Sequence, residues 1–152
     1  MEISRTHIAP RTLLGMHAIV AQPRLTEFFG QAFTAVATEL ANQGEAPAGP
    51  PVALYRWESG SLLDVTAGFP VRGPVDETVT AKIAMIPGGD AVEAIHTGPY
   101  DSLAGDYAEI TEWLRDRGLT PSPVMWEEYL VGPESEDDPE RWTTRIVFPL
   151  QP

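Results

Sequence analysis

Trp126-Glu127-Glu128-Tyr129-Leu130 is a short segment in which two acidic residues are enclosed by large apolar and aromatic ones. The aromatic and apolar content predicts a β-strand, along which successive side chains point to opposite faces. Glu127 and Tyr129 therefore share one face, unless a shift of one residue puts Glu128 there instead. Burying an unpaired carboxylate is costly, so a cationic ligand that supplies the missing charge would explain it. The alternative is that Glu127 is an exposed residue at the edge of a sheet.

The overall composition restricts the kind of partner. The chain has 152 residues, of which 43% are hydrophobic, and its net charge is −12. This length and apolar content fit a single domain over residues 1–152. The negative charge argues against a nucleic-acid partner, which would require patches of Lys and Arg. It favours cationic ligands, although an acidic surface also simply keeps a protein soluble.

Several site types are excluded by the residues that the chain has and lacks. There is no cysteine, so disulfides and thiolate metal sites cannot form. His7, His17 and His96 show no metal-ligand spacing, and we expect neither a metal nor a cofactor. No signal-peptide pattern or apolar run of membrane-spanning length is visible, so we expect a cytoplasmic protein without membrane contact. The oligomeric state is left open.

Hydrophobic periodicity predicts the same order of elements twice. In the first half, we expect two strands, a helix and a hairpin turning at Ser59-Gly60: Ile3–Ala9, Arg11–Val20, Leu25–Gln43, Val52–Glu58 and Leu62–Phe69. In the second half, we expect strands around a second helix that Ser102 caps: Glu77–Ile86, Ala91–Thr97, Ser102–Arg117, Val124–Val131 and Thr143–Phe148. The acidic segment 132–140 between the last two strands is predicted to be a solvated loop.

The two halves can be superimposed on one another in sequence. Pro51–Trp57 aligns with Pro123–Tyr129, and each of these segments follows a helix after a short loop. The alignment predicts a duplicated β-α-β-β unit with pseudo-two-fold symmetry and two equivalent strands beside a central groove. The paired positions are Tyr55 with Glu127 and Trp57 with Tyr129.

The whole chain resembles a GyrI-like small-molecule-binding domain, the family that includes the effector-binding domains of AraC-type and MerR-type transcription activators. Four segments carry the resemblance: His96-Thr97-Gly98-Pro99-Tyr100, then Tyr107 and Trp113-Leu114, then Glu127–Leu130, and finally Thr143–Leu150. The resemblance implies an α+β fold with a curved antiparallel sheet, two long helices and a central ligand cleft. No helix-turn-helix segment is visible, which disfavours direct transcriptional regulation.

The resemblance also implies the site and its chemistry. The glutamate that recognises cationic aromatic compounds in multidrug-responsive members lies in a Glu-x-Tyr pattern, which Glu127-Glu128-Tyr129 matches here. We expect a stand-alone domain that binds hydrophobic, cationic aromatic small molecules and sequesters a toxic compound. Trp126 is expected to pack under a helix. The predicted ligand-binding residues are Glu127, Tyr129, Tyr55, Trp57, Tyr107 and Met125.

Two other functions stay open at this point. Some stand-alone relatives resemble hydrolases that open cyclopropanoid genotoxins. In such an enzyme Glu127 would be the general base or water-orienting residue, and Tyr129 or Tyr107 would donate a proton. Ser102 is expected to be a helix cap rather than a nucleophile, because no histidine or acid lies at an interpretable spacing. The third possibility is a protein-interaction module that acts on gyrase or on a transcription regulator.

Overall fold

The computed structural model describes residues 1–57 and 62–152, so the predicted turn at Ser59-Gly60 lies outside the described residues. The chain divides into two compact units. The α1 unit comprises Ala9–Pro87, and the α2 unit comprises Met1–Ile8 together with Gly88–Pro152. Each unit combines an antiparallel sheet with one long helix, which makes the chain an α+β protein as expected.

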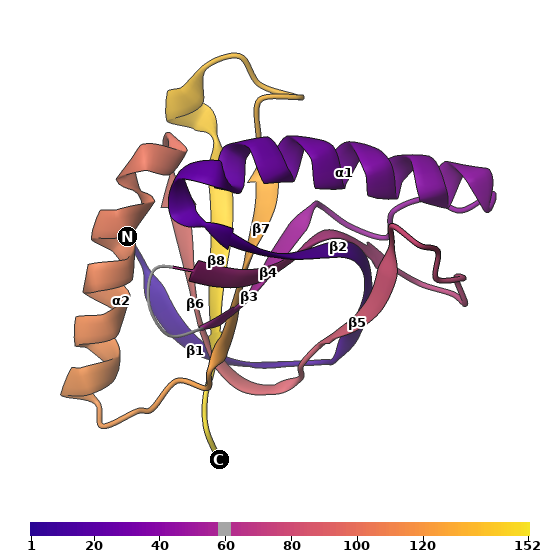
Figure 1. Ribbon diagram of the computed structural model, residues 1–152. Coiled ribbons are helices and arrows are strands. Elements are labelled where there is room, and N and C mark those ends of the chain that lie inside the picture. Colours follow the sequence, from indigo (N-terminus) through magenta and orange to yellow (C-terminus); the bar gives the residue numbers. More distant parts are fainter. Residues whose placement is uncertain (58–61) are drawn as a thin grey trace. The chain divides into compact units, whose positions relative to one another are not determined.

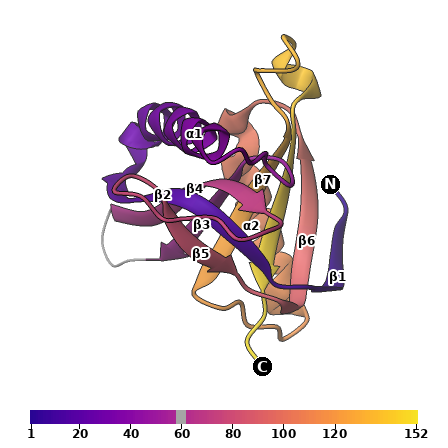
Figure 2. The same cartoon turned by 90° about the vertical axis from the view of Figure 1, so that its right-hand side faces the viewer.

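The α1 unit is a four-stranded antiparallel sheet with the strand order β5-β2-β4-β3. Helix α1 packs against β2 and β4 (Figure 2). Its elements are β2 (Arg11–Ala21), the 3₁₀ turn η1 (Gln22–Arg24), α1 (Leu25–Asn42), β3 (Val52–Trp57), β4 (Leu62–Val71) and β5 (Lys82–Ile86).

The core of the α1 unit lies between its helix and its sheet. Val36 and Leu40 are one turn apart on α1 and are fully buried against Leu14 of β2 and Val71 of β4. Each side chain of this size contributes about 1.5–3 kcal/mol when it is fully buried. The apolar face of α1 therefore accounts for the attachment of this helix to its sheet.

The α2 unit has the strand order β1-β6-β8-β7, and all of its pairs are antiparallel. Figure 1 shows α2 following β6 and leading into β7. The elements are β1 (Ile3–Ile8), β6 (Gly89–Thr97), the 3₁₀ turn η2 (Tyr100–Ser102), α2 (Leu103–Asp116), β7 (Val124–Val131), the 3₁₀ turn η3 (Pro139–Arg141) and β8 (Thr143–Pro149).

The two units share one topology, which is consistent with the expected duplication. In the α1 unit, β2 precedes the helix and pairs with β4, which pairs with β3, the strand after the helix. In the α2 unit, β6 precedes the helix and pairs with β8, which pairs with β7, the strand after the helix. Each sheet also carries an outer strand that belongs, by sequence, to the other half of the chain. β1 directly precedes β2 in sequence but pairs with β6, and β5 directly precedes β6 but pairs with β2.

Three local predictions were wrong. The strand expected over Glu77–Ile86 is only Lys82–Ile86, because the Thr78 hydroxyl accepts backbone N–H groups and forms a turn before it. The strand after it begins at Gly89, two residues before the predicted start at Ala91. Ser102 does not cap α2 with its side chain. Within the described part of the chain, no helix is long and apolar enough to cross a membrane.

Candidate functional site

Strand β7 presents Glu127 and Tyr129 to the face of the sheet that carries α2. Tyr129 lies directly opposite Thr144 of β8, and Thr144 lies opposite His96 of β6. Direct cross-strand partners point to the same face, and the His96 ring contacts the Asp106 carboxylate of α2 through Nδ1. The predicted alternation along β7 therefore places Glu127 and Tyr129 together, on the side of the helix.

Glu127 is a buried carboxylate held by a phenol. Its side chain is 5% exposed, and the Tyr129 hydroxyl donates a hydrogen bond of 2.6 Å to Glu127 Oε1. An O–H group that donates to a carboxylate at this distance forms a strong, charge-assisted bond. The bond fixes the orientation of the carboxylate.

Glu128 lies on the opposite face and belongs to a structural ion-pair network. Arg145 Nη1 donates to its carboxylate at 3.0 Å, and the Trp126 indole N–H does so at 3.2 Å. Arg145 also pairs with Glu93 at 2.6 Å. Trp126 is buried and lies on the same face of β7 as Glu128, away from α2. Glu128 thus has a structural explanation, and Glu127 is the better candidate for ligand contact.

Two further aromatic residues extend the Glu127 face, and sequence reasoning missed both as site residues. The Tyr100 ring meets the Tyr129 ring edge-on, with 5.6 Å between centroids, and lies 4.9 Å from the Trp142 ring. We call Tyr100, Tyr129 and Trp142 the aromatic cluster. Tyr100 and Trp142 are only half-buried, so this part of the face remains accessible. The available signal was the Gly-Pro-Tyr turn that places Tyr100 directly before α2.

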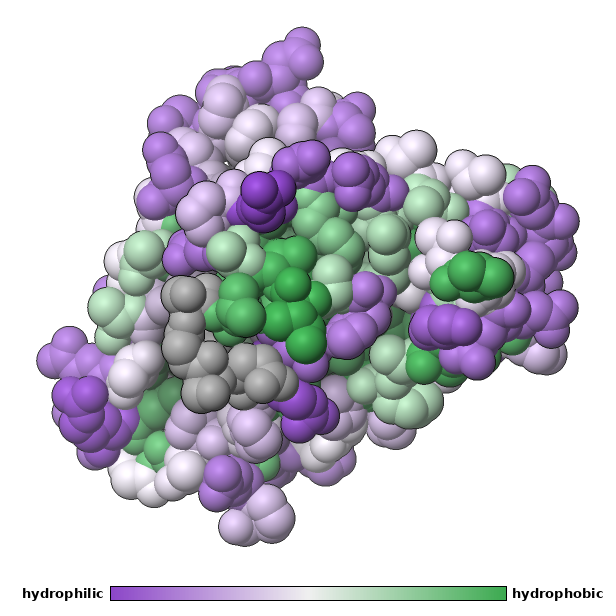
Figure 3. Space-filling model, in the orientation of Figure 1, coloured by the Kyte–Doolittle hydropathy of each residue, from purple (hydrophilic) through white to green (hydrophobic). Residues whose placement is uncertain are grey.

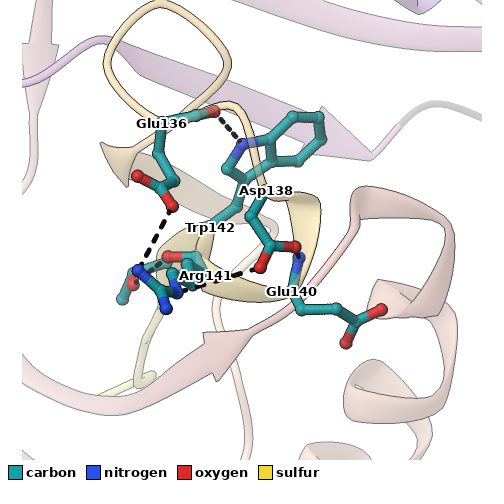
Figure 4. A network of polar contacts seen from close by, with 6 residues as sticks. Glu136, Asp138, Glu140, Arg141 and Trp142 are labelled. Carbon is teal, nitrogen blue, oxygen red and sulfur yellow. Dashed lines mark hydrogen bonds and ion pairs between the residues drawn. The ribbon is translucent and has the colours of Figure 1, made fainter.

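The acidic loop, residues 132–140, is mostly exposed, as predicted, and it also makes internal contacts. The Trp142 indole N–H donates to the Glu136 carbonyl oxygen at 2.8 Å, and Arg141 lies 3.9 Å from the Glu136 carboxylate (Figure 4). Arg141 also lies 3.8 Å from the Asp138 carboxylate. Figure 3 shows that the outer surface of this segment, at the top of the view, is mostly hydrophilic. The loop is thus folded around Trp142 while its acidic groups face water.

Burial, together with the negative charges of Glu134 and Glu127, raises the pKa of Tyr100 to about 12. Tyr100 therefore remains a neutral phenol at physiological pH. The charge of this face comes from carboxylates, and the aromatic cluster contributes neutral rings. Such a combination suits a flat organic cation, which is attracted both to carboxylates and to the faces of aromatic rings.

A second polar group joins β6 to α2 and resembles a catalytic triad. His96 Nδ1 faces the Asp106 carboxylate, and Ser102 Oγ lies 3.1 Å from His96 Nε2. The fold therefore brings a histidine and an acid close to Ser102, although their sequence spacing was not interpretable. However, His96 Nε2 also lies 3.0 Å from the Pro99 carbonyl oxygen, and the Ser102 hydroxyl donates to that oxygen at 2.7 Å.

These contacts determine which ring nitrogen of His96 carries a proton, and the result does not suit a catalytic nucleophile at Ser102. A carbonyl oxygen only accepts, so Nε2 of His96 must carry a proton and cannot act as a base toward Ser102. The group therefore fastens the turn that precedes α2, and its residues have a structural explanation.

The remaining predicted site residues lie in different places. Met125 precedes Glu127 by two positions on the same face and is fully buried. Tyr107 of α2 packs edge-on against Phe148, with 6.0 Å between ring centroids. Tyr55 is buried in β3 of the α1 unit, on the face that α1 covers. Trp57 ends the same strand. Among the described residues, no group of three His, Asp or Glu side chains is placed to hold a metal ion.

Comparison with known proteins supports a small-molecule-binding class of domain. A family model described as the GyrI-like small molecule binding domain matches residues 1–151. The crystal structure of the EcmrR C-terminal domain superposes with a TM-score of 0.81 at 20% identity and covers 99% of this chain and 97% of that one. The chain therefore belongs to the GyrI-like small-molecule-binding family. No relative is found among curated protein sequences.

Two other structural neighbours carry informative descriptions. SAV2435, solved bound to tetraphenylphosphonium, matches with a TM-score of 0.72 at 13% identity, covering 99% of this chain and 94% of that one. A hydrolase encoded by lin2189 from Listeria innocua matches with a TM-score of 0.65 at 15% identity, covering 99% and 92%. At these identities the likeness shows the common fold.

Proposed function

We propose that this protein binds lipophilic organic cations, with Glu127 as the residue that reads the positive charge. The observation that carries the proposal is the buried Glu127 carboxylate, oriented by a 2.6 Å hydrogen bond from Tyr129. The aromatic cluster next to it offers stacking surface, and each cation–π contact contributes about 0.5–2 kcal/mol. Sequestration of a toxic cationic compound is the biological role that fits such a site.

The surroundings of Glu127 support a cation rather than an anion as the ligand. The chain carries a net charge of −12, so its electrostatic field attracts positive ligands over a long range. Arg145 lies opposite Glu128 in the neighbouring strand β8, but its side chain is bound to Glu93 and Glu128 on the face of the sheet away from Glu127. A structural neighbour with the same fold was solved bound to tetraphenylphosphonium, a bulky aromatic cation, and this supports the proposal.

Substitution of Glu127 by glutamine tests the proposal, because it preserves shape and removes charge. We expect Glu127→Gln to weaken tetraphenylphosphonium binding by about 1.5–3 kcal/mol, the range for hydrogen bonds to charged groups. Triphenylphosphine oxide, a neutral compound with similar rings, should lose much less. Isothermal titration calorimetry with both compounds measures the difference.

Glu109→Gln is the matched control, because Glu109 is exposed on α2 and its loss changes the net charge equally. It should leave both affinities within about twofold of the original protein, since exposed charges interact weakly. Equal losses for the cation and the neutral compound in Glu127→Gln would show that Glu127 does not read charge.

Hydrolysis of a strained electrophilic ring is a second candidate, favoured by the same Tyr129–Glu127 hydrogen bond. A carboxylate in a buried environment can accept a proton from an attacking water molecule, and a neighbouring phenol can orient it. If the protein is such an enzyme, Glu127→Gln should abolish turnover of a cyclopropanoid substrate while binding remains measurable. Chromatographic product analysis under single-turnover conditions decides this, and stoichiometric binding without product supports the cation-binding function.

A further inference from the structure

Glu134 of the acidic loop lies beside Tyr100. A β-carbon added to Gly132 would lie 3.0 Å from the Tyr100 hydroxyl oxygen and 3.1 Å from each carboxylate oxygen of Glu134. The phenol and the carboxylate therefore approach the same point, which is open because residue 132 is glycine. Tyr100 in turn contacts Tyr129, whose hydroxyl binds Glu127.

The acidic loop holds Glu134 in this place through its backbone. The N–H groups of Ser135 and Glu136 donate to the Gly132 carbonyl oxygen at 3.1 and 3.0 Å and close a turn around Glu134. The Gly98 N–H donates to the Trp142 carbonyl oxygen at 2.8 Å, which ties the end of the loop segment to the turn that precedes Tyr100. These backbone hydrogen bonds therefore hold Glu134 next to Tyr100 of the aromatic cluster.

Two carboxylates are therefore associated with the Tyr100 ring, one directly and one through Tyr129. Glu127 is buried and lies beyond Tyr129, whereas Glu134 is exposed and lies at the hydroxyl end. The negative charges of both carboxylates contribute to the raised pKa of Tyr100. A ligand stacked on Tyr100 or Trp142 would have one negative group near each end.

Resting on the function proposed above, we propose that Glu134 is a specificity residue and that the site prefers flat aromatic ligands with two positive charges. One charge pairs with Glu127, and the second lies near Glu134. Because Glu134 is exposed, its contribution is smaller than that of Glu127 and is weakened by salt. Ligands with one charge use Glu127 and gain little from Glu134.

Three compounds with the same biaryl skeleton test this preference at pH 8. They are 4-phenylpyridine, which is neutral, N-methyl-4-phenylpyridinium with one charge, and N,N′-dimethyl-4,4′-bipyridinium with two. Calorimetric titration of the full chain at low ionic strength should give a dissociation constant that falls with each added charge. Glu134→Gln should weaken binding of the dication about two- to fivefold, the range for an exposed ion pair, and change binding of the monocation by less than about twofold.

Glu140→Gln is the control, because Glu140 is an exposed residue of the same acidic loop and its substitution changes the net charge equally. It should leave the preference for the dication intact, whereas high salt should remove that preference from the original protein. Equal weakening in Glu134→Gln and Glu140→Gln would overturn the proposal by assigning the effect to the overall charge.

The remaining outcomes separate the two proposals. If the monocation binds and depends on Glu127 but the dication binds no tighter, the role of Glu134 is overturned and the proposed function stands. If neither cation binds, both are overturned.

Discussion

In the α1 unit, the sheet face beneath the helix is apolar, with Leu14, Val71 and their neighbours closed over by Val36 and Leu40. In the α2 unit, the face on the side of the helix carries His96, Thr144 and Glu127 among its buried residues. The strand order is the same, and the buried chemistry differs. Identical topology therefore supports two tasks: the α1 unit is stabilised by its core, and the α2 unit buries polar groups that a purely structural core would avoid.

The largest effect expected from this comparison is on the apolar core. Leu40→Ala removes a fully buried side chain from α1 and should lower the free energy of unfolding by about 2–5 kcal/mol. Denaturant titration measures the change. Cation binding per folded molecule should be preserved. A loss of binding without a loss of stability would show that the α1 unit is more than a scaffold.

An intermediate effect is expected at the polar joint between β6 and α2. His96→Ala removes the ring that contacts both Asp106 and the Pro99 carbonyl oxygen, so it should cost about 1–3 kcal/mol of stability. Ser102→Ala should cost less, since His96 still satisfies that carbonyl. Thermal and denaturant unfolding of both variants test the order, and a larger cost for Ser102→Ala would contradict the assigned proton positions.

The smallest effect is expected at alkaline pH. The pKa of Tyr100 is raised to about 12, above that of an unfolded tyrosine, so the folded protein holds this proton more tightly. The associated stability is fully present below about pH 10 and is lost as the pH rises toward 12. Tyr100→Phe should therefore lose less stability over this interval than the original protein. Absorbance at the tyrosinate band should show one tyrosine titrating late, and its persistence in Tyr100→Phe would contradict the assignment.

The parts of the fold that depend on local pattern could be predicted from the sequence. The 3.6-residue spacing of apolar residues identified both helices. The alternation along β7 identified the shared face of Glu127 and Tyr129. The β5 boundary was missed because Thr78 forms side-chain hydrogen bonds to the backbone that the strand-like composition conceals. Strand propensity does not account for side-chain hydrogen bonds that compete with the pairing of the backbone in a sheet.

The parts of the site that depend on distant residues could not be predicted. Tyr100 and Trp142 are brought together by a turn and a loop, and no periodicity links them. Ser102, His96 and Asp106 lie within one short stretch of sequence, but their association depends on the chain reversing direction at Gly98, whose φ of 131° is open to glycine. The burial of Glu128 depends on Arg145 from another strand.

The exchanged outer strands also constrain how the chain is made and divided. Arg5 of β1 pairs with Asp90, which lies 85 positions later in the sequence, so β1 has no partner strand until that region has been synthesised. During synthesis, the amino-terminal strand leaves the ribosome long before the strand with which it pairs, and pairing between such distant segments is slow. Cutting the gene between Pro87 and Gly88 would leave the four strands of the α1 unit together, with β1 still attached, and would leave the α2 unit without β1. The carboxy-terminal fragment is therefore expected to complete its sheet only when it is co-expressed with the fragment that carries β1.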